Sequence, residues 1–179
     1  LLQTQKGNTV SNLSSTKALR DVTEKAGGSY TASAVGEVNV VDKMKEVKAV
    51  IGGEGNGGVI YPELHYGRDS LVGIALILTY LAKRKIKLSE LRAEYNDYFV
   101  SKNKIELNAD MDVSAIYSKV QKHYQKFPIL TIDGVKIDFP DGWVHLRTSN
   151  TEPIMRIYAE STSMERAQKY ADEVMRLIG

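Results

Sequence analysis

A glycine-rich segment at residues 52–58, Gly-Gly-Glu-Gly-Asn-Gly-Gly, is the first part of the sequence whose residue types could bind a ligand. Because glycine has no Cβ atom, a ligand can approach the backbone closely there. The carboxylate of Glu54 and the side-chain amide of Asn56 accept hydrogen bonds from hydroxyl groups, so the segment suits a neutral, polyhydroxylated ligand. The alternative, equally open from the residues alone, is a glycine-rich turn with a solvated Glu54.

Two nucleotide-binding motifs overlap this segment, and neither fits its surroundings. The glycine spacing satisfies the dinucleotide fingerprint, but that motif needs a helix immediately afterwards, and Pro62 disfavours one. A KH-type G-x-x-G loop would need Lys or Arg to clamp a nucleic-acid backbone, whereas Glu54 is acidic. The sequence therefore argues against a nucleotide or nucleic-acid ligand at this loop.

A second polar segment, residues 147–153, reads Arg-Thr-Ser-Asn-Thr-Glu-Pro, and Arg156 follows three residues later. The planar guanidinium group of arginine matches phosphate oxygens bidentately. Backbone N–H groups of a tight loop can add further donors to an anion. The pattern favours an anion site over the alternative, a polar turn in which Arg147 pairs with Glu152.

A third polar segment, residues 65–70, reads His-Tyr-Gly-Arg-Asp-Ser. Asp69 is most simply the N-cap of the helix that follows. His65 and Arg68 are expected near the glycine-rich segment, without a catalytic role derived from the residues themselves.

The elements expected around the first and third segments alternate as strand and helix, which is the order of an α/β layer. Ser15 or Thr16 is the expected cap of the first helix, and the run 70–82, apolar almost all round, predicts a buried helix. Strands are predicted at residues 10–12, 30–35 and 48–51, and helices at 18–26, 37–44, 70–82 and from 89.

Beyond about residue 95 the predicted strands outnumber the helices. Asp133-Gly134 predicts a two-residue hairpin, and Thr162 with Glu165 predicts a capping box. Helices beside an antiparallel sheet indicate an α+β unit. The strands are predicted at 98–107, 129–132, 135–139, 143–146 and 154–159, and the helices at 113–124 and 164–177.

Composition excludes several classes of protein. The absence of cysteine excludes disulfide scaffolds, thiolate metal sites and cysteine nucleophiles. The 24 basic and 22 acidic residues give a net charge of +2, which offers no case for a nucleic-acid or membrane-surface partner. No run approaches the roughly 20 apolar residues of a membrane span. The first residues have neither an initiator Met nor the layout of a signal peptide, so we expect a cytoplasmic protein and a piece of a longer chain.

Taken together, these segments resemble the phosphohexose mutase superfamily, which includes phosphoglucomutase, phosphomannomutase and phosphoglucosamine mutase. The resemblance is carried by the glycine-rich segment, the Gly-Arg-Asp at 67–69, and the R-x-S-N-T-E-P-x-x-R pattern at 147–156. It covers essentially all 179 residues and identifies them as the third and fourth of four domains. It implies a three-layer α/β domain over residues 1–95 and a smaller α+β domain over residues 96–179, with an antiparallel sheet flanked by helices.

The resemblance also implies a role for each segment. In the family the loop of the third domain binds hexose hydroxyls, a role that falls on Glu54 and Asn56. Many members have His at the position of Gly58, so that contact is absent or replaced in this chain. Residues 35–40 are similar to another ligand-facing loop of that domain. The residues implied to bind phosphate are Arg147, Ser149, Asn150 and Thr151. Three further residues are candidates for contact with the ligand: Arg156, Glu37 and Arg68.

Two other family motifs do not occur in the sequence: the T-A-S-H-N-P-like loop with the phosphorylatable serine, and the Mg²⁺-binding D-G-D-x-D-R loop. The resemblance therefore implies the C-terminal half of an enzyme that interconverts hexose 1-phosphate and hexose 6-phosphate. That enzyme would need Mg²⁺ and the missing N-terminal domains of the same chain, so the 179-residue chain alone is expected to be inactive. The alternative is a stand-alone sugar-phosphate binding module without catalysis.

Overall fold

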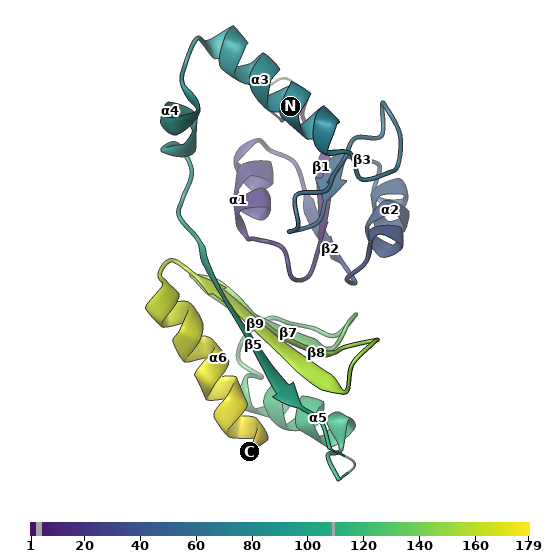
Figure 1. Ribbon diagram of the computed structural model, residues 1–179, viewed down its shortest axis with the longest axis vertical. Coiled ribbons are helices and arrows are strands. Elements are labelled where there is room, and N and C mark those ends of the chain that lie inside the picture. Colours follow the sequence, from purple (N-terminus) through teal and green to yellow (C-terminus); the bar gives the residue numbers. More distant parts are fainter. Residues whose placement is uncertain (3–4, 109) are drawn as a thin grey trace. The chain divides into compact units, whose positions relative to one another are not determined.

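The computed structural model describes residues 1–2, 5–108 and 110–179. The chain divides into two compact units, Leu1–Asn96 (unit 1) and Asp97–Gly179 (unit 2) (Figure 1). Each unit has a sheet and a core of its own. No helix in the described part of the chain is long and apolar enough to cross a membrane.

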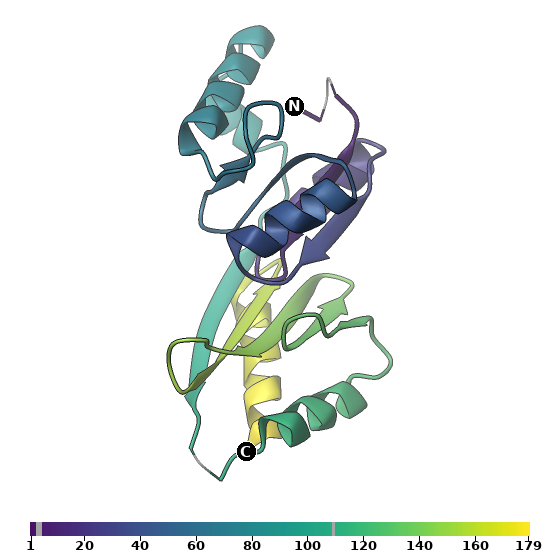
Figure 2. The same ribbon diagram turned by 90° about the vertical axis from the view of Figure 1, so that its right-hand side faces the viewer.

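Unit 1 is a three-layer α/β unit, as the sequence predicts. Its sheet has the order β2-β1-β3-β4, in which β1 runs parallel to β2 and β3, and β4 runs antiparallel to β3. Helices α1 and α2 lie on opposite sides of this sheet (Figure 1), and Figure 2 shows α2, in blue, lying across it. The elements are β1 (Asn8–Asn12), α1 (Ala18–Lys25), β2 (Tyr30–Ser33), α2 (Glu37–Glu46), β3 (Ala49–Gly53) and β4 (Val59–Ile60).

The core of unit 1 lies between α2 and the sheet, where Val10, Val40, Met44 and Ile60 are fully buried. Gly52 permits this close packing, because a Cβ there would lie 2.4 Å from the Met44 sulfur and 2.8 Å from the Val10 carbonyl oxygen. The strand ahead of the glycine-rich segment is thus fixed by tight packing against α2.

The predicted cap of α1 is wrong. The N-cap position is Lys17 rather than Ser15 or Thr16, and no side chain caps the helix. Thr16 Oγ1 does accept a hydrogen bond of 3.3 Å from the backbone N–H of Ala18, the first residue of the helix, but Thr16 lies one position ahead of the N-cap.

Helix α3 (Ser70–Arg84) begins where the sequence predicts, since Asp69 Oδ1 accepts hydrogen bonds from the backbone N–H groups of Leu71 and Val72. The prediction that α3 is buried is wrong: none of its residues is buried, and Leu71 is 74% exposed. The reason is that α3 contacts the sheet beside β4, an edge strand of two residues that offers little surface. The short helix α4 (Leu88–Arg92) follows.

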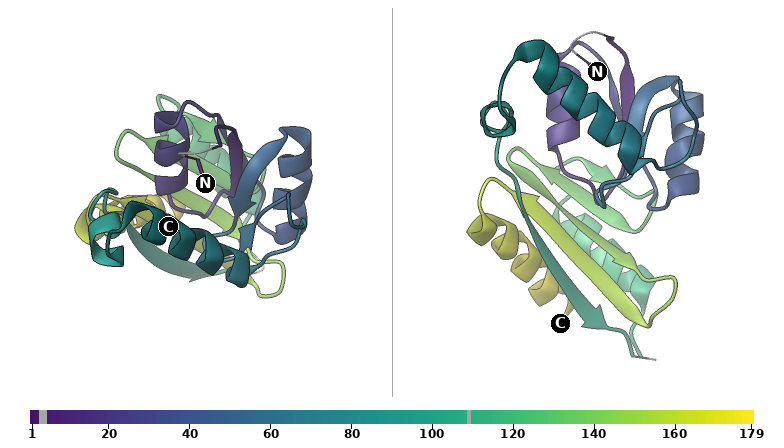
Figure 3. Two further views of the ribbon diagram at one scale, coloured as in Figure 1. Left: turned by 90° about the horizontal axis from the view of Figure 1, so that it is seen from above. Right: turned by 45° about the horizontal axis from the view of Figure 1, so that its top comes forward.

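Unit 2 is a five-stranded antiparallel sheet of order β5-β9-β8-β7-β6. Alternate strand residues such as Ile137, Leu146 and Ile157 form one core with Val120 of α5 and Val174 of α6, so both helices cover the same face (Figure 3). The elements are β5 (Phe99–Glu106), α5 (Val113–His123), β6 (Ile129–Leu130), β7 (Val135–Phe139), β8 (Gly142–Thr148), β9 (Ile154–Ser161) and α6 (Met164–Ile178).

Two local predictions in unit 2 are wrong. Strand β6 ends at Leu130, so the connection to β7 spans residues 131–134 rather than two residues. Helix α6 is capped by Ser163, whose Oγ accepts from the Arg166 N–H at 3.2 Å, rather than by Thr162. Because the N-cap is Ser163, one residue later than the predicted Thr162, Glu165 is at the second helical position and cannot complete a capping box.

Candidate functional site

The glycine-rich segment forms the tight turn of the β3–β4 hairpin. The turn is closed by hydrogen bonds from Glu54 N to Gly58 O (3.1 Å) and from Gly57 N to Glu54 O (3.2 Å). Gly57 has a φ of 89°, a conformation that favours glycine. A strand follows this segment, so the helix that a dinucleotide site requires is replaced by β4.

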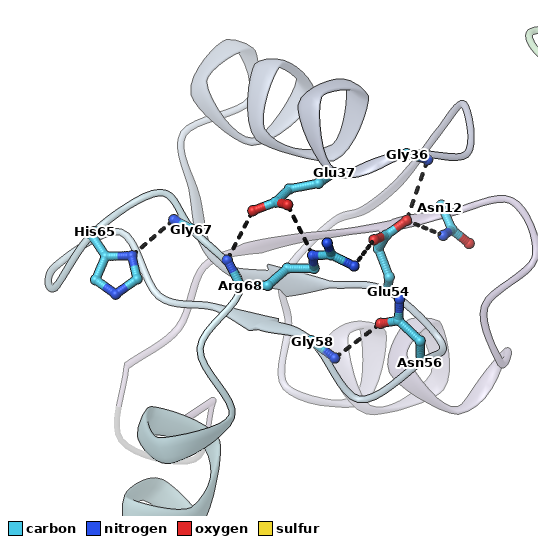
Figure 4. A network of polar contacts seen from close by, with 9 residues as sticks. All are labelled: Asn12, Gly36, Glu37, Glu54, Asn56, Gly58, His65, Gly67 and Arg68. Carbon is cyan, nitrogen blue, oxygen red and sulfur yellow. Dashed lines mark hydrogen bonds and ion pairs between the residues drawn. The ribbon is translucent and has the colours of Figure 1, made fainter.

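The carboxylate of Glu54 is held by donors from three other segments (Figure 4). Oε1 accepts from Asn12 Nδ2 at 2.9 Å and from the Gly36 backbone N–H at 3.3 Å, and Oε2 accepts from Arg68 Nη1 at 3.2 Å. The side chain of Glu54 is 7% exposed. Its carboxylate is therefore held in a fixed orientation rather than freely solvated.

Arg68 connects this carboxylate with a second one. Its Nε donates to Glu37 Oε2 at 2.9 Å, and its backbone N–H donates to Glu37 Oε1 at 3.0 Å. The backbone N–H of Arg68 is the main cause of a lowered pKa of Glu37. We call Asn12, Glu37, Glu54 and Arg68 the Glu54 cluster. It joins the end of β1, the start of α2, the hairpin turn and the segment before α3.

The Arg68 side chain also lies over Gly58. A Cβ atom at position 58 would lie 2.6 Å from Arg68 Cδ, which is closer than any normal contact. The space beside this glycine is thus already occupied by the side chain that joins Glu37 to Glu54.

Asn56 and His65 lie outside the Glu54 cluster. Asn56 is exposed, and its Oδ1 accepts from the Gly58 N–H at 3.1 Å within the turn. His65 Nδ1 accepts from the Gly67 N–H at 2.9 Å, so Nε2 carries the proton that faces Asp69 Oδ2 at 3.2 Å. The pKa of Asp69 is lowered, first by the Val72 N–H and then by His65.

Asn12 is a member of the cluster that the sequence analysis missed. It ends β1, and β3, which ends just before Glu54, is the parallel neighbour of β1. Its own Oδ1 accepts from Ser14 N and Ser15 Oγ, which orients Nδ2 toward Glu54. The sequence could have indicated this contact, because polar residues at the carboxyl ends of neighbouring parallel strands meet at one edge of a sheet.

The second polar segment, which we call the Arg147 loop (residues 147–153), connects β8 and β9. The loop is narrow: Ser149 N donates to Ile154 O at 2.9 Å, and Thr151 N lies 3.4 Å from Ser149 Oγ. The hydroxyl oxygens of Ser149 and Thr151 are 3.5 Å apart. Ser149, Asn150 and Thr151 therefore gather donors at one exposed turn.

Two arginines stand directly opposite each other at the base of this loop, since Arg147 on β8 is the register partner of Arg156 on β9. The expected alternative pairing is wrong, because Glu152 binds Arg156 Nη2 at 3.0 Å rather than Arg147. Among the described residues, the buried Nε atoms of both arginines have no hydrogen-bond acceptor. Like charges opposite each other destabilise a sheet, and Glu152 offsets only the charge of Arg156, so an anion bound at Arg147 would offset the other.

Tyr117 of α5 also touches this loop, which the sequence analysis did not foresee. Its hydroxyl accepts a hydrogen bond of 3.1 Å from the Thr148 backbone N–H. The contact fixes the end of β8 at the point where the loop begins. In the sequence Tyr117 is one of the residues on the apolar side of the helix predicted at 113–124. That pattern does not indicate that its hydroxyl accepts a hydrogen bond from the strand.

The described parts of the chain contain no group of three or more His, Asp or Glu side chains arranged to hold a metal ion. The Mg²⁺ implied by the resemblance therefore finds no fitting ligand set among these residues.

Comparisons with protein families agree with this architecture. Residues 1–98 match the model described as phosphoglucomutase/phosphomannomutase, alpha/beta/alpha domain III, and residues 104–177 match the model of the C-terminal domain of the same family.

Curated relatives and solved structures give the same picture. A phosphoglucomutase/phosphomannomutase of Thermococcus kodakarensis is 37% identical over 96% of this chain and 38% of its own length. A phosphoglucosamine/phosphogalactosamine mutase of Sulfurisphaera tokodaii is 33% identical over 94% of this chain and 38% of its own length. A putative phosphomannomutase structure from Thermus thermophilus has a TM-score of 0.71 and 25% identity, and covers 98% of this chain and 37% of its own. The chain thus spans about 38% of the length of the curated relatives it matches.

Proposed function

Because the chain belongs to the phosphoglucomutase/phosphomannomutase family, we propose that it supplies the sugar-binding and phosphate-binding domains of a phosphohexose mutase. The complete enzyme moves a phosphoryl group between the C1 and C6 oxygens of a hexose phosphate. A bisphosphorylated sugar turns over in the site during this cycle, so the protein must bind both the hydroxyls and the phosphate of its ligand in two orientations.

The observation that carries the proposal is the pair of buried, unpartnered Nε atoms of Arg147 and Arg156. A phosphate bound by Arg147 accepts hydrogen bonds from its guanidinium group, and the hydroxyls of Ser149 and Thr151 add donors from the exposed turn. Asn150 contributes a further amide donor. Arg156 already pairs with Glu152 and donates to the Tyr158 hydroxyl, so Arg147 is the guanidinium group proposed to bind the phosphate.

The Glu54 cluster is proposed to bind sugar hydroxyls. Glu54 retains unused acceptor capacity on its two oxygens, and its orientation is fixed by its partners. Asn56 offers its exposed side-chain amide beside it. Glu37 and Arg68 position the carboxylate rather than contact the sugar, because their polar groups are already paired with each other.

Within the complete enzyme, this chain binds and orients the substrate. The sequence lacks the loop with the donor serine, and its described residues offer no Mg²⁺ site, so we assign no transfer step to its own side chains. The 179-residue chain alone should not turn over glucose 1-phosphate, while the complete protein should. Turnover by the pure 179-residue chain would refute the proposal that this chain binds the substrate without carrying out the transfer step.

Titration of the chain with inorganic phosphate, followed by amide NMR, tests the phosphate site. The resonances of residues 147–151 should move, and Arg147→Ala should weaken binding about 10- to 100-fold, the loss of a charge-assisted hydrogen bond. Arg147→Lys should restore binding only in part, because an ammonium group cannot bind bidentately. Arg176→Ala removes an exposed arginine of α6 and should leave the affinity unchanged. Unmoved loop resonances, with shifts elsewhere, would refute the site.

A further inference from the structure

Helix α3 carries an apolar stripe that nothing in unit 1 covers. Its side chains are spaced at i, i+3, i+4, i+7 and i+11, so they share one side of the helix. Leu71, Ile74 and Leu78 of this stripe are 74%, 52% and 59% exposed. We define the α3 stripe as the exposed residues Leu71, Ile74, Ala75, Leu78 and Ala82.

The opposite side of α3 is apolar as well, but it is partly covered. Val72, Leu76 and Tyr80 are half-buried, and Gly73 packs against Val59 of β4. Between Ser70 and Ala82 the helix has no charged residue on any side. A helix that is apolar all round is typical of a position buried on both sides, whereas here only one side has a covering layer.

We propose that the α3 stripe is the docking surface for a domain that precedes residue 1 in the complete mutase chain. This inference rests on the proposed function, which makes the 179 residues part of a longer protein. This chain matches 38% of the length of its Thermococcus kodakarensis relative, so about 62% of that length lies outside the match. Residues 1–98 match the model numbered as domain III. The partner surface must be apolar, because the stripe offers no charge or hydrogen-bonding side chain.

The size of the stripe favours a tethered domain over a second copy of the chain. The stripe runs from Leu71 to Ala82, about 18 Å along the helix, so at a width of about 10 Å it covers on the order of 180 Å². Stable dimers bury roughly 800 Å² on each partner. A domain of the same chain needs less contact area, because the peptide linkage already provides a high effective concentration.

Thiol reactivity tests the docking surface, because the sequence has no cysteine. Leu71→Cys and Leu78→Cys place a thiol on the stripe, and Lys83→Cys places one on an exposed position of the same helix but away from the stripe. Ala75→Cys repeats the measurement with a change of a single atom. Each variant is made in the 179-residue chain and in the complete protein, with any cysteine of the added region replaced by serine. The rate of reaction with a small aromatic disulfide is then measured.

In the 179-residue chain all thiols should react at similar rates. In the complete protein the stripe thiols should react at least about 30-fold more slowly, and the Lys83→Cys thiol should change less than about 3-fold. Equal rates in both proteins would overturn the proposal. Protection already present in the 179-residue chain would also overturn it, in favour of a second copy if it grows with concentration and of a contact within this chain if it does not.

Mutase activity of the complete protein, measured on the same samples, separates this proposal from the proposed function. An active enzyme with unprotected stripe thiols refutes only the docking surface. Protected thiols in a protein that folds but does not isomerise any hexose phosphate refute only the proposed function.

Discussion

Replacing Glu54 by Gln changes one atom of the Glu54 cluster and should destabilise unit 1. The Gln carbonyl oxygen can keep the two hydrogen bonds from Asn12 Nδ2 and the Gly36 N–H. Its NH₂ group then faces Arg68 Nη1, which is also a donor, so the Glu54–Arg68 ion pair of 3.2 Å is lost.

The size of the effect follows from the exposure of the pair. A hydrogen bond between charged groups contributes about 1.5–3 kcal/mol when it is buried. The Glu54 side chain is 7% exposed but that of Arg68 is 43% exposed, and Arg68 keeps its ion pair with Glu37. We therefore reduce the expected loss to about 1 kcal/mol. For a unit of 96 residues this corresponds to a fall in Tm of about 4–8 °C.

The assay uses two probes of thermal unfolding. Far-UV circular dichroism follows the helices of both units, whereas fluorescence of Trp143, the sole tryptophan, reports on unit 2. Glu54→Gln should lower the midpoint of the circular dichroism transition.

Glu46→Gln is the matched control, because it removes a carboxylate that is 64% exposed and pairs with Lys43 on the helix surface. It should cost less than about 0.5 kcal/mol. Equal effects of the two variants, or a shift seen only by Trp143, would refute the reasoning.

Three other changes have outcomes that the contacts determine. Gly58→Ala should displace the Arg68 side chain and cost about 1–2 kcal/mol of unfolding free energy in chemical denaturation, unless Arg68 is also shortened to Ala. Burial lowers the pKa of His145 to about 4, so the unfolded state binds a proton below about pH 6.5 that the folded state does not. The free energy of unfolding should therefore fall by up to about 3 kcal/mol between pH 6.5 and pH 4, and His145→Gln should remove this part of the slope; identical pH profiles would contradict it. Tyr117→Phe leaves the Thr148 N–H without its acceptor and should cost about 0.5–1.5 kcal/mol, with weaker phosphate binding by isothermal calorimetry as the second readout.

The sequence predicts features that depend on near neighbours. Asp69 caps α3 because its carboxylate needs only the next two or three N–H groups. Pro62 disfavours a helix directly after the glycine-rich segment, as the sequence analysis expects, whereas the short strand β4 found there is not among the predicted strands. Such signals involve a few consecutive residues, so the local sequence is sufficient to identify them.

Features that depend on distant partners escape prediction. Asn12 and Glu54 are 42 positions apart and meet only because β1 and β3 pair in a particular register. Glu152 pairs with Arg156 rather than Arg147 because the register of the β8–β9 hairpin brings Arg156 within hydrogen-bond distance. The prediction that α3 is buried is wrong for a different reason. The sequence pattern identifies apolar side chains but not the layer that covers them.

The contact between Arg68 and Gly58 makes the two positions epistatic. A larger residue at position 58 needs the space that Arg68 occupies, so it is tolerated only together with a shorter residue at position 68. Shortening position 68 alone leaves Glu37 and Glu54 without their shared cation. Across the family the two positions should therefore covary, and a library that randomises both should contain functional pairs whose single substitutions are each harmful.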